Sequence, residues 1–262
     1  MIVEGFPSWR VVLVDLRCHG ESAAAAGGAP APGPHTVDSA ARDVLQLLRA
    51  RRMFPNMLIG HSFGGKVVMS MARQFASGAG TALPRPVQVW VLDAPPGEAR
   101  AGGGAGGGDD VDHPARLIEA LARVPMPVAG RGELVEHLTR QGFSAAIATW
   151  MTTNLRPSES GGLKWAFDLE GIAQMYASYE ATALWDLLRA PPQGLRVDFV
   201  KAARSAFGWD GEGAIGALGH GVHLLDAGHW VHTDNPGGLF NILAPSLGEL
   251  DHGRRQARQL AH

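Results

Sequence analysis

The segment Gly60-His61-Ser62-Phe63-Gly64 places one serine between two glycines, where an apolar run gives way to a helical pattern. A serine nucleophile needs an exposed hydroxyl, a neighbouring base and backbone N–H groups that stabilise the oxyanion. A sharp strand-to-helix turn exposes the hydroxyl, and we expect only glycine to fit the crowded flanking positions, Gly60 and Gly64. The pattern alone arises by chance in a glycine-rich chain, so its strand and helix context supports the prediction. We predict Ser62 as a nucleophile and the Phe63 N–H as an oxyanion donor.

Among eleven histidines, position favours His229 as the base. It lies in the turn after the last apolar run, Val222–Asp226, and catalytic groups of open α/β sheets gather at the carboxyl ends of strands. His232 is the nearest rival, but it precedes Asp234-Asn235-Pro236, which is typical of a helix start, so we expect a capping or packing role. The histidines expected to be structural are His19, His61 and His223.

Two aspartates are candidates for the acid that orients the base. Asp93 closes the apolar run Val87–Asp93, and Asp210 follows the next run only after a longer loop. A carboxylate at a strand end can accept the Nδ1–H of a histidine and so fix its tautomer. We favour Asp93 and keep Asp210 as the alternative acid.

Five apolar runs could form the strands that position these residues. They are rich in Val, Leu and Ile with little alternation, which is typical of strands buried on both faces of a parallel sheet. Helical patterns lie between them, at residues 37–52, with Asp38 or Ser39 as the expected N-cap, and at 64–76. We predict an α/β fold with a mostly parallel sheet flanked by helices. The runs are Val11–Asp15, Met57–Gly60, Val87–Asp93, Val197–Ala202 and Val222–Asp226.

The pattern changes in the middle of the chain, which predicts an insertion. Residues 97–112 are glycine-rich and low in complexity, and we expect a disordered surface loop. Residues 113–193 show helical periodicity only, so we expect an all-helical cap inserted between two strands. The hydrolase core then consists of residues 1–112, including the loop, and 194–262.

Composition excludes several classes of function. The formal charge is −2 without a basic block, so no nucleic-acid partner is expected, and the single cysteine excludes an intramolecular disulfide. No apolar run approaches the roughly 20 residues of a membrane span. The N-terminus lacks a signal-peptide pattern. We expect a soluble intracellular protein, in the cytoplasm or in an organelle if a targeting peptide lies upstream of Met1. Its oligomeric state is not predicted.

Several segments resemble the α/β-hydrolase superfamily, most closely the small esterase branch of bacterial acyl-ester esterases, the eleventh human abhydrolase-domain protein and its plant and algal relatives. The resemblance implies hydrolysis of small acyl esters or thioesters by a Ser–His–Asp triad under a helical cap, with no metal or organic cofactor. It places the nucleophile at Ser62, the base at His229 and the acid at Asp93. The matching segments are "FPSWRVVLVDLRCHGES", "IGHSFGGKVVM", "VWVLDAPPG", "WAFDLEGIAQM" and "AGHWVHTDNP".

The sequence departs from this family at its beginning. Family members open with a strand and a His-Gly loop whose backbone supplies a second oxyanion N–H, and this chain starts ten residues before the segment that resembles the fourth strand. We therefore keep, as the alternative, a non-catalytic α/β-hydrolase-fold protein or an inactive truncated form. Hydrolysis of a carbon–carbon bond by the same triad also stays open. His229 and His232 lack a third ligand nearby, so no zinc site is expected there.

Overall fold

The computed structural model describes residues 1–24, 32–76, 86–99, 113–205 and 211–260. Most of the expected glycine-rich loop, residues 100–112, and Asp210 lie outside these ranges. The chain divides into two compact units. We call Met1–Val14, Leu45–Gly97 and Ala183–His262 the sheet unit, and Asp15–Val44 and Glu98–Thr182 the helical unit.

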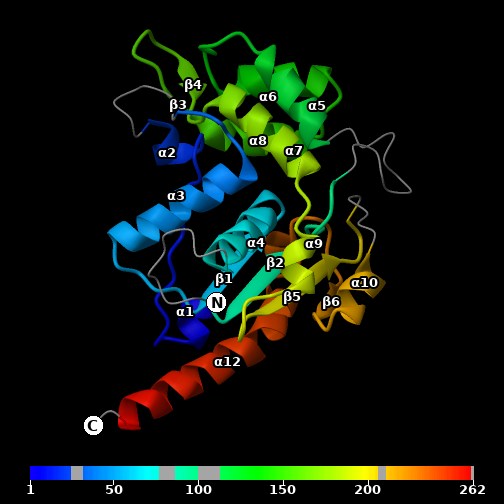
Figure 1. Cartoon of the computed structure of the whole chain (residues 1–262). Coiled ribbons are helices and arrows are strands. Elements are labelled where there is room, and N and C mark those ends of the chain that lie inside the picture. The colour runs from blue at the N-terminus through cyan, green and yellow to red at the C-terminus, as the bar shows by residue number, and fades with distance from the viewer. Residues whose placement is uncertain (25–31, 77–85, 100–112, 206–210, 261–262) are drawn as a thin grey trace. The chain divides into compact units, whose positions relative to one another are not determined.

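The sheet unit is built on four parallel strands in the order β1-β2-β5-β6 (Figure 1). They are β1 (Met57–His61), β2 (Gln88–Leu92), β5 (Arg196–Ala202) and β6 (Val222–Leu225). Four of the five predicted strands are thus confirmed, with bounds that differ by a residue or two. Because the strands are parallel, the loops after them leave from one edge of the sheet.

Helices cover both faces of this sheet, which explains its apolar strands. Helix α4 (Phe63–Ala76) packs on β1 and β2, where Gly65 lies against the Val91 side chain. On the other face, Trp90 and Leu92 belong to a buried cluster that includes three leucines of α12 (Pro236–Leu260). Burial on both faces, complete along β2, removes the need for polar side chains to alternate along that strand. The remaining helices of this unit are α1 (Ile2–Gly5), α9 (Trp185–Arg189), α10 (Glu212–Ala217) and α11 (Val231–Asp234).

The predicted strand Val11–Asp15 is wrong. These residues have no regular secondary structure, and the Leu13 side chain is 92% exposed. A strand needs a neighbour that satisfies its backbone N–H and C=O groups. Among the described residues no strand pairs with this segment, and β1 is an edge strand whose only partner is β2. Apolar composition therefore did not suffice to make a strand.

Helix α3 (Val37–Ala50) confirms the predicted helix but not its cap. Thr36 Oγ1 accepts the N–H of Ser39 at 3.0 Å, so Thr36 is the N-cap and the expected role of Asp38 or Ser39 is wrong. A threonine before the helix can act as the N-cap because its hydroxyl reaches the third N–H of the first turn.

The helical unit contains residues 113–182 of the segment expected to be an all-helical cap, whereas residues 183–193 belong to the sheet unit. The expectation that the segment is all-helical also needs a correction. Residues Leu155–Pro157 (β3) and Leu163–Trp165 (β4) form a two-stranded antiparallel sheet. Gly161 and Gly162 close this hairpin with φ of +88° and +71°, a conformation that glycine adopts without strain. The helices of this unit are α2 (Gly20–Ala24), α5 (Pro114–Ala122), α6 (Arg131–Arg140), α7 (Ala145–Met151), the 3₁₀ turn Thr152–Asn154 and α8 (Leu169–Ala181).

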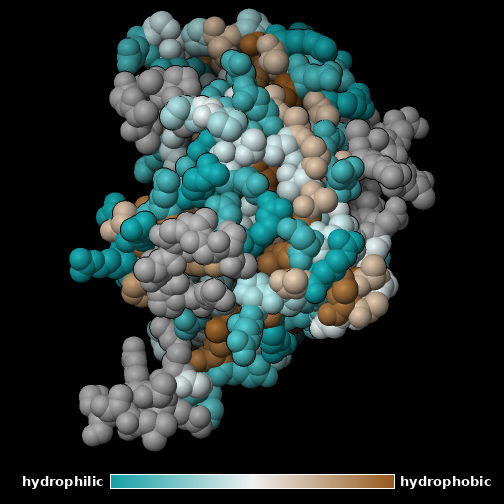
Figure 2. Space-filling model, in the orientation of Figure 1, coloured by the Kyte–Doolittle hydropathy of each residue, from teal (hydrophilic) through white to brown (hydrophobic). Residues whose placement is uncertain are grey.

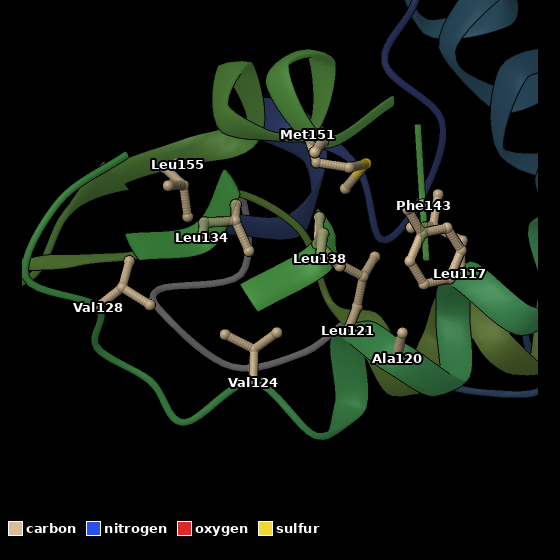
Figure 3. Close-up of a cluster of buried hydrophobic side chains, with 11 residues drawn as sticks. Leu117, Ala120, Leu121, Val124, Val128, Leu134, Leu138, Phe143, Met151 and Leu155 are labelled. Carbon is tan, nitrogen blue, oxygen red and sulfur yellow. The ribbon is translucent and has the colours of Figure 1, made fainter. Parts of the chain in front are cut away.

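The helical unit has an apolar core of its own (Figure 3). Leu134 and Leu138 of α6 are fully buried, and they pack with residues of α5, α7 and the hairpin. This separate core explains why the segment forms a compact unit.

The outer surface is mostly polar on the face drawn in Figure 2, where hydrophobic residues form only small groups. In the described ranges, no helix combines the length and the apolar character that crossing a membrane requires.

Candidate active site

Ser62 sits on a strained turn between β1 and α4. Its φ is +52°, which is unusual for a residue with a side chain. The Ser62 N–H donates to the Leu92 carbonyl at 2.9 Å, and the Ser62 carbonyl accepts the Gly65 N–H at 2.9 Å. The turn is therefore anchored to the neighbouring strand and to the helix that follows.

The glycines around this serine are not equivalent. A Cβ on Gly60 would lie 2.1 Å from the Gly64 carbonyl oxygen, so only glycine fits there, as expected. A Cβ on Gly64 would meet no atom within 4 Å outside its own helical turn, so the expectation of crowding at Gly64 is wrong. The crowded second position is Gly65, whose Cβ would lie 3.0 Å from the side chains of Val91 and Ala94. Close packing of α4 on β2 therefore requires Gly65.

Asp93 and His229 are brought together by the ends of β2 and β6. His229 Nδ1 donates to Asp93 Oδ2 at 2.8 Å, although the two residues are 136 positions apart in the sequence. Asp93 is 2% exposed and has a φ of +46°, while its N–H donates to the Val200 carbonyl at 2.8 Å. Because the carboxylate accepts the Nδ1–H, His229 Nε2 is left as the proton acceptor.

Further hydrogen bonds keep Asp93 ionised. The Ala202 N–H donates to Asp93 Oδ1 at 3.1 Å, and the Ser205 side chain also donates to this carboxylate. Burial would raise the pKa of Asp93, but the hydrogen bonds from His229, Ser205 and Ala202 outweigh burial and lower the pKa below its ordinary value. Sequence reasoning did not identify Ser205, because nothing in its local pattern indicates this contact.

His61 has a more specific place than the packing role expected for it. Its Nε2 donates to the backbone carbonyl of His229 at 2.7 Å, and the two rings lie 4.6 Å apart. Burial, together with the charge of His229, lowers the pKa of His61 to about 4. His61 is therefore neutral near pH 7, with its proton on Nε2. Its position next to Ser62 was the only sequence signal for this role.

His232, the rival base, lies at the edge of this group. Its ring is 5.2 Å from the ring of His61 and 6.2 Å from that of Trp230. No hydrogen bond joins His232 to Asp93. Among the described residues, the histidine that donates to Asp93 is His229.

The remaining candidates for catalysis are the Ser62 hydroxyl, the Phe63 N–H and Asp210. Within the described residues, the Ser62 hydroxyl makes no hydrogen bond, although Ser62 and His229 lie at the same edge of the sheet. Phe63 is the first residue of α4, and backbone N–H groups at a helix start point away from the helix, toward where an anion can bind. The alternative acid Asp210 cannot be compared, since it lies outside the described residues.

Comparisons with known proteins agree with this architecture. The sequence model of the Alpha/beta hydrolase family matches residues 4–242. Two similar curated proteins are each named sn-1-specific diacylglycerol lipase ABHD11. The Xenopus laevis protein is 27% identical, and the match covers 89% of this chain and 69% of the relative. The Mus musculus protein is 26% identical, and the match covers 87% of this chain and 68% of the relative. Among solved structures, a marine microorganism esterase has a TM-score of 0.68 at 19% identity over 88% of this chain and 82% of its own. An E-2-(acetamidomethylene)succinate hydrolase has a TM-score of 0.60 at 18% identity over 91% and 78%. At these identities, the two solved structures bear on the fold alone.

Proposed function

This chain belongs to the alpha/beta hydrolase family, and we propose that it is a serine hydrolase that cleaves carboxylic or thio esters of acyl groups. In this proposal Ser62 is the nucleophile, His229 the base and Asp93 the acid that orients His229. The observation that carries it is the 2.8 Å contact between His229 Nδ1 and the buried Asp93 carboxylate, at the sheet edge where Ser62 occupies a strained turn.

The proposed reaction begins with attack of Ser62 Oγ on the acyl carbon. His229 Nε2 takes the hydroxyl proton, and the Phe63 N–H stabilises the oxyanion of the tetrahedral intermediate. Asp93 stays ionised and stabilises the imidazolium that forms. The intermediate collapses to an acyl-enzyme, and His229 returns the proton to the departing alcohol or thiol. A water molecule then attacks the acyl group by the same steps, which regenerates Ser62 and releases the acid.

The nature of the relatives narrows the substrates to try first. Two of the similar proteins are diacylglycerol lipases, so a diacylglycerol is the natural type of ester to test, after a soluble p-nitrophenyl butyrate. A thioester of the same acyl group tests the leaving-group preference. Small acyl esters are proposed as substrates, and no charged macromolecular partner is proposed.

The decisive experiment compares the wild-type chain with Ser62→Ala. We expect hydrolysis of p-nitrophenyl butyrate, and covalent labelling by a fluorophosphonate probe, in the wild type but not in Ser62→Ala. Labelling reports an activated nucleophile independently of substrate choice. If folded wild-type protein is neither active nor labelled, a non-catalytic α/β-hydrolase-fold protein is the better account. The observation in its favour is that the Ser62 hydroxyl makes no hydrogen bond within the described residues.

A further inference from the structure

Three side chains that bind transition metals meet in the helical unit, apart from the residues proposed for catalysis. Cys18 Sγ lies 3.3 Å from His35 Nδ1, and a carboxylate oxygen of Asp168 joins them, with all three atoms within 4.8 Å of one another. Cys18 is 1% exposed and His35 is 7% exposed. Burial distinguishes this cluster from the exposed acidic groups that are common on protein surfaces.

Local backbone geometry holds the three groups in place. Cys18 adopts a φ of +65°, and its carbonyl accepts the Asp168 N–H at 2.8 Å. Asp168 caps helix α8 through Oδ1, which accepts the Gly171 N–H at 3.1 Å. The position of Asp168 is therefore fixed by its backbone and by one carboxylate oxygen.

Gly171 leaves the space that the cluster needs. A Cβ at this position would lie 2.3 Å from Cys18 Sγ and 2.8 Å from Asp168 Oδ2. Both potential ligand atoms thus point toward the backbone of α8 at a position where no side chain intervenes. Oδ2 is the carboxylate oxygen that the helix cap does not use.

The charges around the cluster favour a cation. Within the described ranges Asp168 forms no ion pair, and the guanidinium of Arg17, next to Cys18 in the sequence, is already bound by both oxygens of Asp43 at 2.6 and 2.8 Å. Burial, and secondarily the Asp168 carboxylate, raise the pKa of the Cys18 thiol to about 11.

We propose that Cys18, His35 and Asp168 bind a divalent transition metal ion, Zn²⁺ before others, through Sγ, Nδ1 and Oδ2. Tetrahedral zinc with Zn–S of about 2.3 Å and Zn–N of about 2.0–2.1 Å separates sulfur from nitrogen by roughly 3.5 Å, and the cluster already has 3.3 Å. The Cys18 thiol releases its proton to solvent, His35 binds as neutral imidazole with its proton on Nε2, and water fills the fourth position. The ion links the loop at Cys18, the segment before α3 and the start of α8.

Co²⁺ is the probe that tests this proposal in the untagged full chain. We expect saturable binding of one Co²⁺ per chain, with the near-ultraviolet thiolate-to-cobalt charge-transfer band and the release of about one proton. Cys18 is the only cysteine of the chain, so the charge-transfer band by itself identifies Cys18 as the thiolate ligand. Zn²⁺ should abolish the band by competition and should raise the melting temperature.

Variants identify the other ligands. Cys18→Ser, which can keep the hydrogen bond to His35, should remove the charge-transfer band and the thermal shift. Asp168→Asn and His35→Ala should weaken Co²⁺ binding at least about tenfold, while His19→Gln, next to Cys18 but outside the cluster, should bind as the wild type does. Absence of the band from folded wild-type protein, or a wild-type thermal shift in Cys18→Ser, would overturn the proposal. None of these readouts depends on esterase activity.

Discussion

His61 Nε2 donates a hydrogen bond to the backbone carbonyl of His229 across 2.7 Å. The residue that precedes Ser62 therefore holds the loop that carries the proposed base. The same loop is held from the other side by the bond between His229 Nδ1 and Asp93 Oδ2. His229 is thus positioned by contacts from the ends of both β1 and β2.

Loss of the His61 donor should impair turnover more than substrate binding. His61→Phe keeps a ring but leaves the His229 carbonyl without its partner, so we expect kcat to fall about tenfold, which corresponds to about 1.4 kcal/mol, with little change in KM. His61→Gln, whose side-chain amide can donate from a similar position, should stay within about threefold of the wild type. Equal kcat values for wild type and His61→Phe in esterase assays would show that the contact does not position His229.

The neutral state of His61 should also make stability depend on pH. Its pKa in the folded chain is about 4, against an ordinary value of 6.5, so the unfolded chain binds more protons between these values. The free energy of unfolding contributed by this group is therefore fully present above about pH 6.5 and is lost as the pH falls toward 4. Urea denaturation from pH 4.5 to 7 should show this slope in the wild type and a shallower one in His61→Gln. Identical slopes would contradict the assignment.

Asp93 should be needed for turnover beyond its contribution to stability. Asp93→Asn can no longer favour the Nδ1–H tautomer of His229, and we expect kcat to fall about 10³-fold or more. Asp198→Asn is the matched control, because Asp198 is also a buried carboxylate of this sheet, bonded to Gln88 and to the Gly221 N–H. This control should lower the melting temperature and leave kcat within about threefold.

The acid assignment has a direct competitor in Asp210. Asp210→Asn should leave kcat near the wild-type value if Asp93 is the acid. A large loss in Asp210→Asn, with Asp93→Asn active, would transfer the role to Asp210.

The two glycines of the serine motif should respond in opposite ways to alanine. Gly60→Ala places a methyl group 2.1 Å from a backbone oxygen, so the turn must distort, and we expect a much lower melting temperature or no soluble protein. Gly64→Ala meets no such obstacle and lies in the first turn of α4, where alanine favours helix, so its melting temperature should equal or exceed that of the wild type. Similar losses in both variants would show that the second glycine is also sterically required.

The sequence predicted most of the sheet because its strands are encoded locally. The runs at β1, β2, β5 and β6 are rich in Val, Leu and Ile, and each ends in turn or loop residues. The segment Val11–Asp15 has a similar apolar composition, but no strand pairs with it in the described structure. Composition alone therefore predicted a strand where there is none. The hairpin β3–β4 was missed because two three-residue strands are too short to show a period.

Local sequence determined the serine turn, with its strand, its obligatory Gly60 and its helix, because steric fit within a few residues decides such a turn. It also placed Asp93 and His229 at strand ends. Only the tertiary structure decided that Asp93 accepts a hydrogen bond from His229 Nδ1–H, that His61 holds the His229 backbone, and that Cys18, His35 and Asp168 converge. These contacts join residues from 17 to 168 positions apart, and no local pattern encodes them. They arise because parallel strands end at one edge and because separate loops pack into one core.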